Sequence, residues 1–292
     1  MPLALAPLGL WPLALFTPAA LAWLCWQQDA RTTTLSHFSF GLGMFGVGVS
    51  WVFVSIHNFG NAPLPLALLM TAIFVSFLAA IFCLNASLLT SKALRQTRSL
   101  PLYLCAFCAI WVLGEWLRSW LLTGFPWLYI GYSQWQTPLA GWAPIIGVFG
   151  LSLLTVISGS ALLFILKTPS LILRLVTALS VIGLWSGGAL LEHKAWTTAK
   201  GEAIEVALVQ ANIAQERKWQ PDFLMPTLER YRDLSQQAWQ ADWLIWPEAA
   251  IPMLYHQATP FLEKTHQQAI QSETALITGI LYDDPFERKI YN

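Results

Sequence analysis

Long runs of apolar residues fill the first 191 positions of the chain, and shorter mixed patterns follow them. A helix needs about 20 predominantly apolar residues to cross the hydrocarbon core of a bilayer. Six stretches of about this length predict six membrane-spanning helices: Gly9 to Trp26, Phe38 to Ile56, Leu64 to Leu89, Leu100 to Leu122, Leu139 to Leu166 and Leu171 to Leu191. A signal peptide is the alternative for the first stretch, but Pro12 and Pro18 interrupt it, no basic segment precedes it and further spans follow it.

The pattern changes after residue 201, where shorter runs predict an α/β domain. The predicted order is strand, helix, strand, helix, strand, which is typical of layered α/β folds. These elements are Glu202 to Ile213, Pro221 to Ala241, Trp243 to Trp246, Pro260 to Ser272 and Ala275 to Tyr282. Three strands and two helices are too few for a closed domain, so we expect an incomplete one. The sequence thus predicts an α-helical transmembrane bundle over residues 1–191 and part of an α/β domain over residues 192–292.

The composition supports a membrane protein. Of the 292 residues, 56% are hydrophobic and 11% are charged, whereas soluble chains carry about 25% charged residues. The 16 basic and 16 acidic residues are unevenly placed, because nine of them lie in the first 191 positions and 23 in the last 101. The net charge is zero and no basic cluster occurs, which argues against nucleic acid as a partner. No metal-ligand spacing, phosphate loop or nucleotide fingerprint is present, so we expect no cofactor.

The Lys and Arg residues of the short loops predict the orientation, because an excess of positive charge stays cytoplasmic. Within these loops, basic residues occur only in the first, third and fifth: Arg31, Lys92, Arg95, Arg98, Lys167 and Arg174. We therefore expect the odd-numbered loops to be cytoplasmic and the soluble part after Leu191 to lie on the outer side, together with Met1. An outer N-terminus without a preceding export segment leads us to expect a further span upstream of this sequence.

The uncharged fourth loop, LTGFPWLYIGYSQWQTP at residues 122–138, is rich in aromatic residues. Five of them fall within eleven positions: Phe125, Trp127, Tyr129, Tyr132 and Trp135. Such side chains settle where acyl chains meet headgroups. One interpretation is an ordinary aromatic belt, and the other is a lipid-binding surface below the outer domain. On the second interpretation, we expect Trp127 and Tyr129 to line the access route of an acyl chain.

Two further pairs lie inside the fourth predicted span. Glu115 and Arg118 are three residues apart and so share one helix face. Because an isolated charge in a membrane is costly, we expect them to form a structural ion pair near the outer end. Cys105 and Cys108 form a C-x-x-C pattern, and we expect both to be small packing residues and not a redox pair.

One segment of the soluble part carries a chemical signal, DWLIWPEAAIP at residues 242–252. A hydrophobic strand is followed at once by Pro247, and Glu248 then lies where the chain turns. A carboxylate at the end of a strand can act as a general base, and we expect the apolar neighbours Trp246 and Ile251 to shield it from water. The alternative is a Glu at a helix N-terminus, where the helix dipole stabilises its charge.

Four motifs resemble one family. The segments VALVQANIAQERKW at 206–219 and LIWPEAAIP at 244–252 resemble the start of the nitrilase-like domain of bacterial apolipoprotein N-acyltransferases. The segments WVFVSIHNFG at 51–60 and EWLRSWLLTGFPWLYIGYSQ at 115–134 resemble the membrane part of the same family. The resemblance covers essentially the whole chain, and these motifs in this order are specific to the family.

The resemblance implies a multi-pass enzyme of the bacterial inner membrane whose nitrilase-like domain, an α-β-β-α sandwich, faces the periplasm. It implies the last step of lipoprotein maturation, in which an acyl chain moves from a phospholipid to the α-amino group of an S-diacylglyceryl cysteine. The partners would thus be a phospholipid donor, a diacylglyceryl apolipoprotein acceptor and membrane lipids. The family uses a Glu, a Lys and a Cys that is acylated to a thioester. Glu248 matches the Glu, which is the general base. Trp219 matches a position near the active site and is expected to contact substrate, or else to be a surface aromatic or staple.

The sequence also departs from the family pattern. Neither Lys264 nor Lys289 lies in the family's lysine motif, and all four cysteines lie in the apolar part. We therefore expect an internal piece of the enzyme that lacks the first span, the Lys and the Cys, and that has no acyltransferase activity by itself. Two other interpretations stay open: a non-catalytic transporter or lipoprotein-binding scaffold with a degenerate outer domain, and a hydrolase of small amides, against which the membrane motifs argue.

Overall fold

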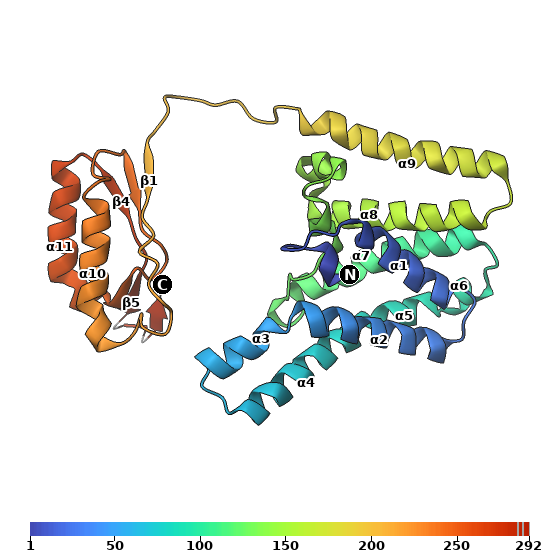
Figure 1. The fold of residues 1–292 in the computed structure, drawn as a ribbon, viewed down its shortest axis with the longest axis horizontal. Helices are drawn as coiled ribbons and strands as arrows, with labels where there is room; N and C mark the ends of the chain where they lie inside the picture. Colours follow the sequence, from blue (N-terminus) through green and yellow to red (C-terminus); the bar gives the residue numbers. More distant parts are fainter. Residues whose placement is uncertain (285, 288, 292) are drawn as a thin grey trace. The chain divides into compact units, whose positions relative to one another are not determined.

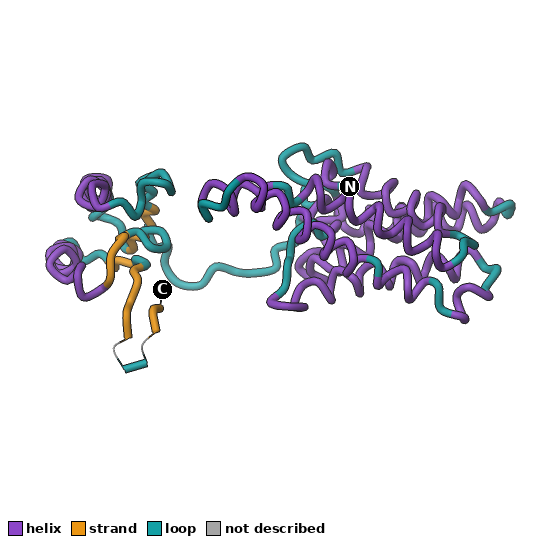
Figure 2. The backbone as a smooth tube through the Cα atoms, turned by 90° about the horizontal axis from the view of Figure 1, so that it is seen from below, coloured by secondary structure: helices purple, strands orange, loops and turns teal. Residues whose placement is uncertain are grey.

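A computed structural model describes residues 1–284, 286–287 and 289–291 of the chain. The chain divides into two compact units, Met1–Thr197 and Thr198–Asn292. The first unit is helical, and the second combines helices with strands (Figures 1 and 2). This confirms the predicted fold class, a helical membrane region followed by a small α/β region.

The helical unit is built from nine α-helices and five short 3-10 or π segments in the part of the chain that the structure describes. In chain order these are η1 (Pro2–Ala4), α1 (Pro12–Cys25), α2 (Ala30–Gly48), α3 (Trp51–Val54), η2 (Ser55–Phe59), α4 (Leu64–Phe82), α5 (Leu84–Leu89), α6 (Lys92–Gln96), α7 (Leu100–Trp120), η3 (Leu121–Thr123), η4 (Ile130–Gln134), η5 (Pro138–Trp142), α8 (Ala143–Lys167) and α9 (Leu171–Glu192).

The number of candidate spans is smaller than the six that the sequence predicts. Four segments are long and apolar enough to cross a membrane: Leu64–Leu89, Leu100–Thr123, Pro138–Lys167 and Leu171–Glu192. A fifth candidate is the pair α2 and Trp51–Phe59, which is bent by 51°. The helix α1 has only 14 residues, which at 1.5 Å per residue is about 21 Å and too short for a core of about 30 Å. The prediction of a full span at Gly9 to Trp26 is therefore wrong, because the helix begins only at Pro12.

The largest hydrophobic core of the helical unit is centred on α7. Phe107 and Trp111 of this helix are buried, and the hydroxyl of Tyr103 donates to the carbonyl of Ala22 on α1 at 3.2 Å. On α8, a Cβ at Gly159 would lie 2.1 Å from a backbone oxygen of α1. Only glycine therefore permits this close approach of two helices.

The two cysteines of the C-x-x-C pattern have different surroundings. Cys108 is buried, and its Sγ lies 3.3 Å from the hydroxyl of Ser160 on α8. Cys105 is exposed on the surface of the unit. Neither forms a disulfide with the other, since both thiols are free.

The loops of the helical unit separate by charge. The connections at residues 26–29, 90–99 and 168–170 lie at one end of the bundle, and those at 57–63 and 121–137 lie at the other (Figure 1). The first group carries or adjoins the basic residues, and the second group carries none. The structure therefore gives the bundle one cationic end and one uncharged, aromatic end.

In its described residues, the second unit contains two small sheets and two helices. Its elements are β1 (Val206–Leu208), α10 (Pro221–Ser235), β2 (Trp243–Ile245), β3 (Ile251–Leu254), α11 (Tyr255–Gln271), β4 (Ala275–Ile277), β5 (Ile280–Asp284) and β6 (Lys289–Tyr291). One sheet has the order β1-β2-β4 and is parallel throughout, and the other has the order β3-β5-β6. In the second sheet β3 and β5 are parallel, whereas β5 and β6 are antiparallel. Both helices lie on the same side of the strands (Figure 1).

Several predicted boundaries in this unit were wrong. The strand predicted over 275–282 divides into β4 and β5, with Thr278 and Gly279 between them. The helix α11 begins at Tyr255, five residues before Pro260, and α10 ends at Ser235 and not at Ala241. The strand predicted over 202–213 is confined to β1, and β3 and β6 were not predicted. Short strands with no alternating pattern leave little signal in a sequence.

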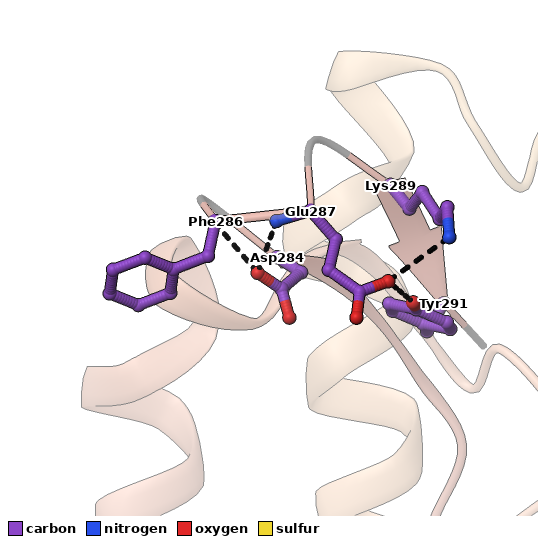
Figure 3. Close-up of polar contacts among 5 residues, drawn as sticks. All are labelled: Asp284, Phe286, Glu287, Lys289 and Tyr291. Atoms are coloured by element: carbon purple, nitrogen blue, oxygen red, sulfur yellow. Dashed lines mark hydrogen bonds and ion pairs between the residues drawn. The ribbon is translucent and has the colours of Figure 1, made fainter.

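The antiparallel pair of β5 and β6 is closed by side-chain hydrogen bonds (Figure 3). Asp284 Oδ1 accepts the backbone N–H groups of Phe286 and Glu287 at 2.7 and 3.0 Å. Glu287 Oε2 accepts from the hydroxyl of Tyr291 and from Lys289 Nζ, and these two bonds hold the pKa of the Glu287 carboxyl below its ordinary value. The turn is thus fixed by its own polar side chains.

Candidate functional site

Glu248 lies at the carboxyl end of β2, the central strand of the parallel sheet. The chain turns directly after the strand, where the N–H of Ala250 donates to the carbonyl of Pro247 at 3.2 Å. Ala249 adopts a φ of 47°, in the left-handed region that non-glycine residues seldom occupy. In open α/β sheets ligands bind outside the carboxyl ends of the strands. The turn therefore presents Glu248 at the edge where a substrate is expected.

Trp246 anchors this turn from the core side. Its backbone N–H donates to the carbonyl of Ile277 on β4 at 2.9 Å, and its Nε1 donates to the hydroxyl of Ser235 on α10 at 2.9 Å. The ring also packs on that of Tyr231, with centroids 5.1 Å apart. The strand end before Glu248 is thus bonded to a neighbouring strand and to a helix.

The expectation that Trp246 and Ile251 shield the carboxylate was wrong. Both side chains are buried in the hydrophobic core of the unit, whereas Glu248 is exposed. The turn after β2 explains the difference, because it takes Glu248 out of the extended run whose Trp246 packs into the core. The carboxylate therefore faces solvent, while its neighbours face the helices.

Gly279 is a part of the site that the sequence analysis did not identify. A Cβ at this position would lie 2.9 Å from the backbone nitrogen of Ala249 and 3.0 Å from the Cα of Glu248. The segment after β4 therefore packs directly on the backbone of the turn, at a distance that only glycine permits. A glycine within a strand pattern is the available signal, since it often marks a close approach of another backbone.

The segment that precedes α10 also reaches the turn. Lys218 Nζ donates to the backbone carbonyl of Glu248 at 3.4 Å. Trp219, the next residue, is 50% exposed. The structure thus places Lys218 at the turn and leaves the indole of Trp219 accessible, although the sequence analysis singled out only Trp219.

The described residues contain no group of three or more His, Cys, Asp or Glu side chains that could hold a metal ion. The site at Glu248 is instead a single carboxylate on a constrained turn. Such a group can accept a proton from a nucleophile that approaches the strand end.

The aromatic loop of the helical unit forms a second candidate site. Trp127 is 46% exposed, and its ring stacks on Phe125 at 5.0 Å and lies 5.6 Å from that of Trp51. Tyr129 is only 2% exposed and lies between the rings of Tyr132 and Phe149. Of the two residues predicted to line an acyl-chain route, the structure therefore exposes Trp127 and buries Tyr129.

The prediction of an ion pair between Glu115 and Arg118 was wrong. Both side chains are buried, yet no salt bridge shorter than 4.0 Å joins these two described residues. Each bonds instead to the loop that follows α7. Glu115 Oε1 accepts the N–H of Ile130 at 2.9 Å, and Arg118 Nη1 donates to the carbonyl of Phe125 at 3.3 Å. One loop amide and two loop carbonyls thus bond to side chains that were expected to bond to each other.

These features define a multi-pass membrane protein that carries a small α/β unit with a carboxylate at the end of its central strand. Residues 1–161 match the family model of the apolipoprotein N-acyltransferase N-terminal domain. The chain therefore belongs to the apolipoprotein N-acyltransferase family, and the resemblance noted in its motifs is confirmed.

Similar proteins extend this match beyond residue 161. The chain is 39% identical over 292 residues to the apolipoprotein N-acyltransferase of Coxiella burnetii, an alignment that covers 100% of this chain and 60% of the relative. It is 40% identical over 281 residues to that of Vibrio cholerae, and 41% identical over 283 residues to that of Pseudomonas paraeruginosa. Those alignments cover 96% of this chain and 54% and 55% of the relatives. The chain thus spans a little more than half the length of the relatives it matches.

Proposed function

We propose that this chain supplies the membrane region and the general base of a phospholipid-dependent N-acyltransferase that completes lipoprotein maturation. The observation that carries the proposal is the position of Glu248 on its constrained turn, in a chain 39–41% identical to proteins named apolipoprotein N-acyltransferase. The acyl donor is a phospholipid, and the acceptor is the α-amino group of an S-diacylglyceryl cysteine on an apolipoprotein.

The proposed reaction has two steps, and Glu248 acts in the first. Its carboxylate takes the proton of a cysteine thiol, the thiolate attacks an ester carbonyl of the phospholipid, and a thioester forms as the lysophospholipid leaves with the proton. A lysine ammonium stabilises the oxyanion of this step. The α-amino group of the acceptor then attacks the thioester, which forms the amide and releases the thiol. Residues 198–292 contain no cysteine, so the thiol is not part of this unit of the sequence.

The aromatic loop is the proposed route of the acyl donor. Trp127 is exposed on it and would contact the acyl chain, whereas the buried Tyr129 would support it from below. The helix α9, from which the second unit follows, packs on η5, the segment after this loop: Trp142 Nε1 donates to the carbonyl of Leu184 at 3.0 Å. A substrate that is half lipid needs a site at the membrane surface, which agrees with this arrangement.

The outer, periplasmic side is the proposed location of the second unit. The connections at 90–99 and 168–170, which carry or adjoin basic residues, lie at the opposite end of the bundle from the aromatic loop (Figure 1). Positive loops stay cytoplasmic, so the aromatic end and the chain that leaves α9 would be outside. This argument does not depend on whether α1 crosses the membrane. Trp219 is proposed to contact substrate from the segment beside the Glu248 turn.

The experiment that tests the proposal is a chimera in which these 292 residues replace the aligned segment of the Coxiella burnetii protein. The chimera is incubated with phosphatidylethanolamine, and the acyl-enzyme is detected by mass spectrometry as an adduct that hydroxylamine removes. We expect the adduct in the chimera and a loss of about 10²- to 10⁴-fold in its rate of formation in Glu248→Gln, the range typical of a general base.

A matched control is Glu263→Gln, which changes an exposed carboxylate on α11 of the same unit. We expect it to form the adduct at the rate of the unsubstituted chimera. Equal rates in Glu248→Gln and Glu263→Gln would exclude Glu248 as the base. A chimera that folds but forms no adduct would favour the alternative, a non-catalytic membrane protein with a degenerate outer domain.

A further inference from the structure

Two buried charged residues on α7 take no part in the proposed reaction. Glu115 and Arg118 are each 5% exposed in the membrane-embedded unit. Charged side chains in such places are rare and costly unless they bind something specific. Their partners therefore indicate what they are for.

Most of their polar partners lie in the loop that follows α7. Glu115 Oε1 accepts the N–H of Ile130 at 2.9 Å, in addition to the Nε1 of Trp111 on its own helix at 3.1 Å. Arg118 Nη1 donates to the carbonyls of Phe125 and Trp127. The backbone carbonyl of Arg118 accepts the N–H of Phe125 at 2.8 Å. The side chains of Glu115 and Arg118 thus bond to the segment Phe125–Ile130 at its first, third and last residues.

The loop at residues 121–130, which contains this segment, has an unusual backbone. Leu122, Thr123 and Leu128 have φ angles of 51°, 76° and 60°, which non-glycine residues seldom adopt. At Gly124, with a φ of 85°, a Cβ would lie 2.1 Å from the carbonyl oxygen of Ser119. The loop therefore folds tightly back over the end of α7, and this shape persists only where surrounding groups fix it.

The aromatic side chains follow from this backbone. The guanidinium of Arg118 lies 5.0 Å from the ring centroid of Tyr129, which is buried, and its two carbonyl partners flank Pro126. Trp127 is directed outward on the same segment and stacks on Phe125. The bonds that fix the loop thus also fix which aromatic ring is buried and which is exposed.

We propose that Glu115 and Arg118 are positioning residues that hold the loop so that Trp127 contacts the acyl chain of the phospholipid donor. The proposal rests on the proposed function, since that function assigns the donor route to this loop. The chemistry of the two side chains suits the task. A guanidinium can donate to two carbonyls at once, which a lysine ammonium on a single stem does poorly. A carboxylate oxygen accepts two N–H groups, and the amide oxygen of Gln can do the same.

The test uses the 292-residue chain in nanodiscs that contain a phosphatidylethanolamine with a diazirine in one acyl chain. Mass spectrometry after illumination gives the ratio of label on the peptide around Trp127 to label on α9, an apolar helix of which only a small share is buried inside the unit. Hydrogen exchange gives the protection of the Ile130 amide in the same samples. A change confined to the loop alters the ratio of labels. A general loss of structure changes the label on both peptides and can be recognised from the α9 peptide.

We expect Glu115→Ala to lower protection at Ile130 about tenfold, as loss of a charge-assisted hydrogen bond does, and to lower the label ratio severalfold. Glu115→Gln should retain both. Arg118→Ala and Arg118→Lys should both lower the label ratio. Arg118→Lys keeps the positive charge, so it still gives a result if Arg118→Ala does not fold. The control Leu113→Ala changes an exposed side chain of α7 and should leave both readouts unchanged.

An unchanged label ratio in Glu115→Ala and in Arg118→Lys would overturn the proposal, as would full protection of Ile130 without the Glu115 carboxylate. A different result would contradict the proposed function. If the unsubstituted chain carries no label around Trp127, this loop is not the route of the acyl donor, even if the variants lower the protection of the Ile130 amide.

Discussion

Glu115 and Glu248 are chemically identical side chains in opposite situations. Glu115 is buried in the helical unit, and its carboxylate bonds to the backbone of the loop that it supports. Glu248 is exposed, and its backbone is held by other residues, through the carbonyl contact of Lys218 and the close packing of Gly279. The conformation of the loop after α7 thus depends on the carboxylate of Glu115. The position of the Glu248 carboxylate instead depends on the residues that hold its turn.

This difference predicts which changes affect stability and which affect chemistry. Removing a buried carboxylate leaves buried donors without partners, which is costly. Removing an exposed one leaves the fold intact, because surface substitutions away from special features change stability by less than about 0.5 kcal/mol. The two residues therefore separate a structural role from a reactive one within a single chain.

The largest expected effect is the loss of stability in Glu115→Ala. The buried N–H groups of Trp111 and Ile130 would lose their acceptor, so we expect the helical unit to be destabilised by about 3 kcal/mol. Glu248→Gln should change stability by less than about 0.5 kcal/mol. Unfolding of the chain in detergent by increasing SDS, followed by hydrogen exchange of each unit, measures both. Equal losses in the two variants would remove the distinction drawn above.

The next effect tests the backbone around Glu248. In Gly279→Ala the new methyl group would meet the turn at 2.9–3.0 Å, and overpacking of this kind costs about 1–3 kcal/mol. We expect the turn to shift and acyl-enzyme formation in the chimera to fall, while the helical unit keeps its exchange pattern. Gly201→Ala is not a clean control because its φ is 80°. Gly183→Ala on α9 is better, since a Cβ there meets no atom within 4 Å. Unaltered acyl-enzyme formation in Gly279→Ala would show that the turn tolerates displacement.

Within each unit, the sequence predicted the helices and strands better than the contacts that these elements make with one another. The helical spacing of Glu115 and Arg118 correctly put them on one face, but nothing local shows that the loop folds back to meet them, since that fold depends on the left-handed backbone at residues 122–124. The segment over 275–282 is apolar except at Thr278 and Gly279, where it divides into β4 and β5, and the contact of Gly279 with the Glu248 turn is not visible in the sequence.

At the candidate site, too, the sequence predicted the position of a residue along its element but not its contacts with other elements. The pattern of an apolar strand followed by Pro247 located Glu248 at a strand end, as the structure has it. The burial of Trp246 and Ile251 could not be read from their apolar character alone, because it depends on which face α10 and α11 cover. Pro260 was taken as a helix start, since proline favours the first turn, but α11 begins five residues earlier.

A smaller effect is expected where one bond anchors the turn. Trp246→Phe keeps the apolar ring in the core and removes the donor to Ser235. We expect a destabilisation of the second unit by about 1 kcal/mol, the typical net contribution of such a bond. Amide exchange of β2 in the full chain measures it. Ser235→Ala removes the acceptor of the same bond and should give a similar loss, and the double variant should lose no more than about the larger of the two if the bond is the cause.

The smallest effect concerns a third carboxylate, Asp283, whose side chain is 41% exposed and bonds to His256 on α11. Its Oδ1 lies 2.9 Å from His256 Nδ1, and this bond lowers the pKa of Asp283 below its ordinary value of 3.8. A carboxyl with a lowered pKa in the folded state stabilises that state above its unfolded value, and the contribution is lost as the pH falls through the lowered value. His256→Ala should therefore return the pKa of Asp283 toward 3.8, as read from the carboxyl carbon by NMR titration, while His266→Ala on the same helix should not. Both side chains are partly exposed, so the effect of the pair on stability should be screened by salt. It should be complete above about pH 4 and be lost as the pH falls through the lowered pKa of Asp283. A midpoint for Asp283 that is the same in His256→Ala and in the unsubstituted chain would show that exposure alone sets the behaviour of a carboxylate in this unit.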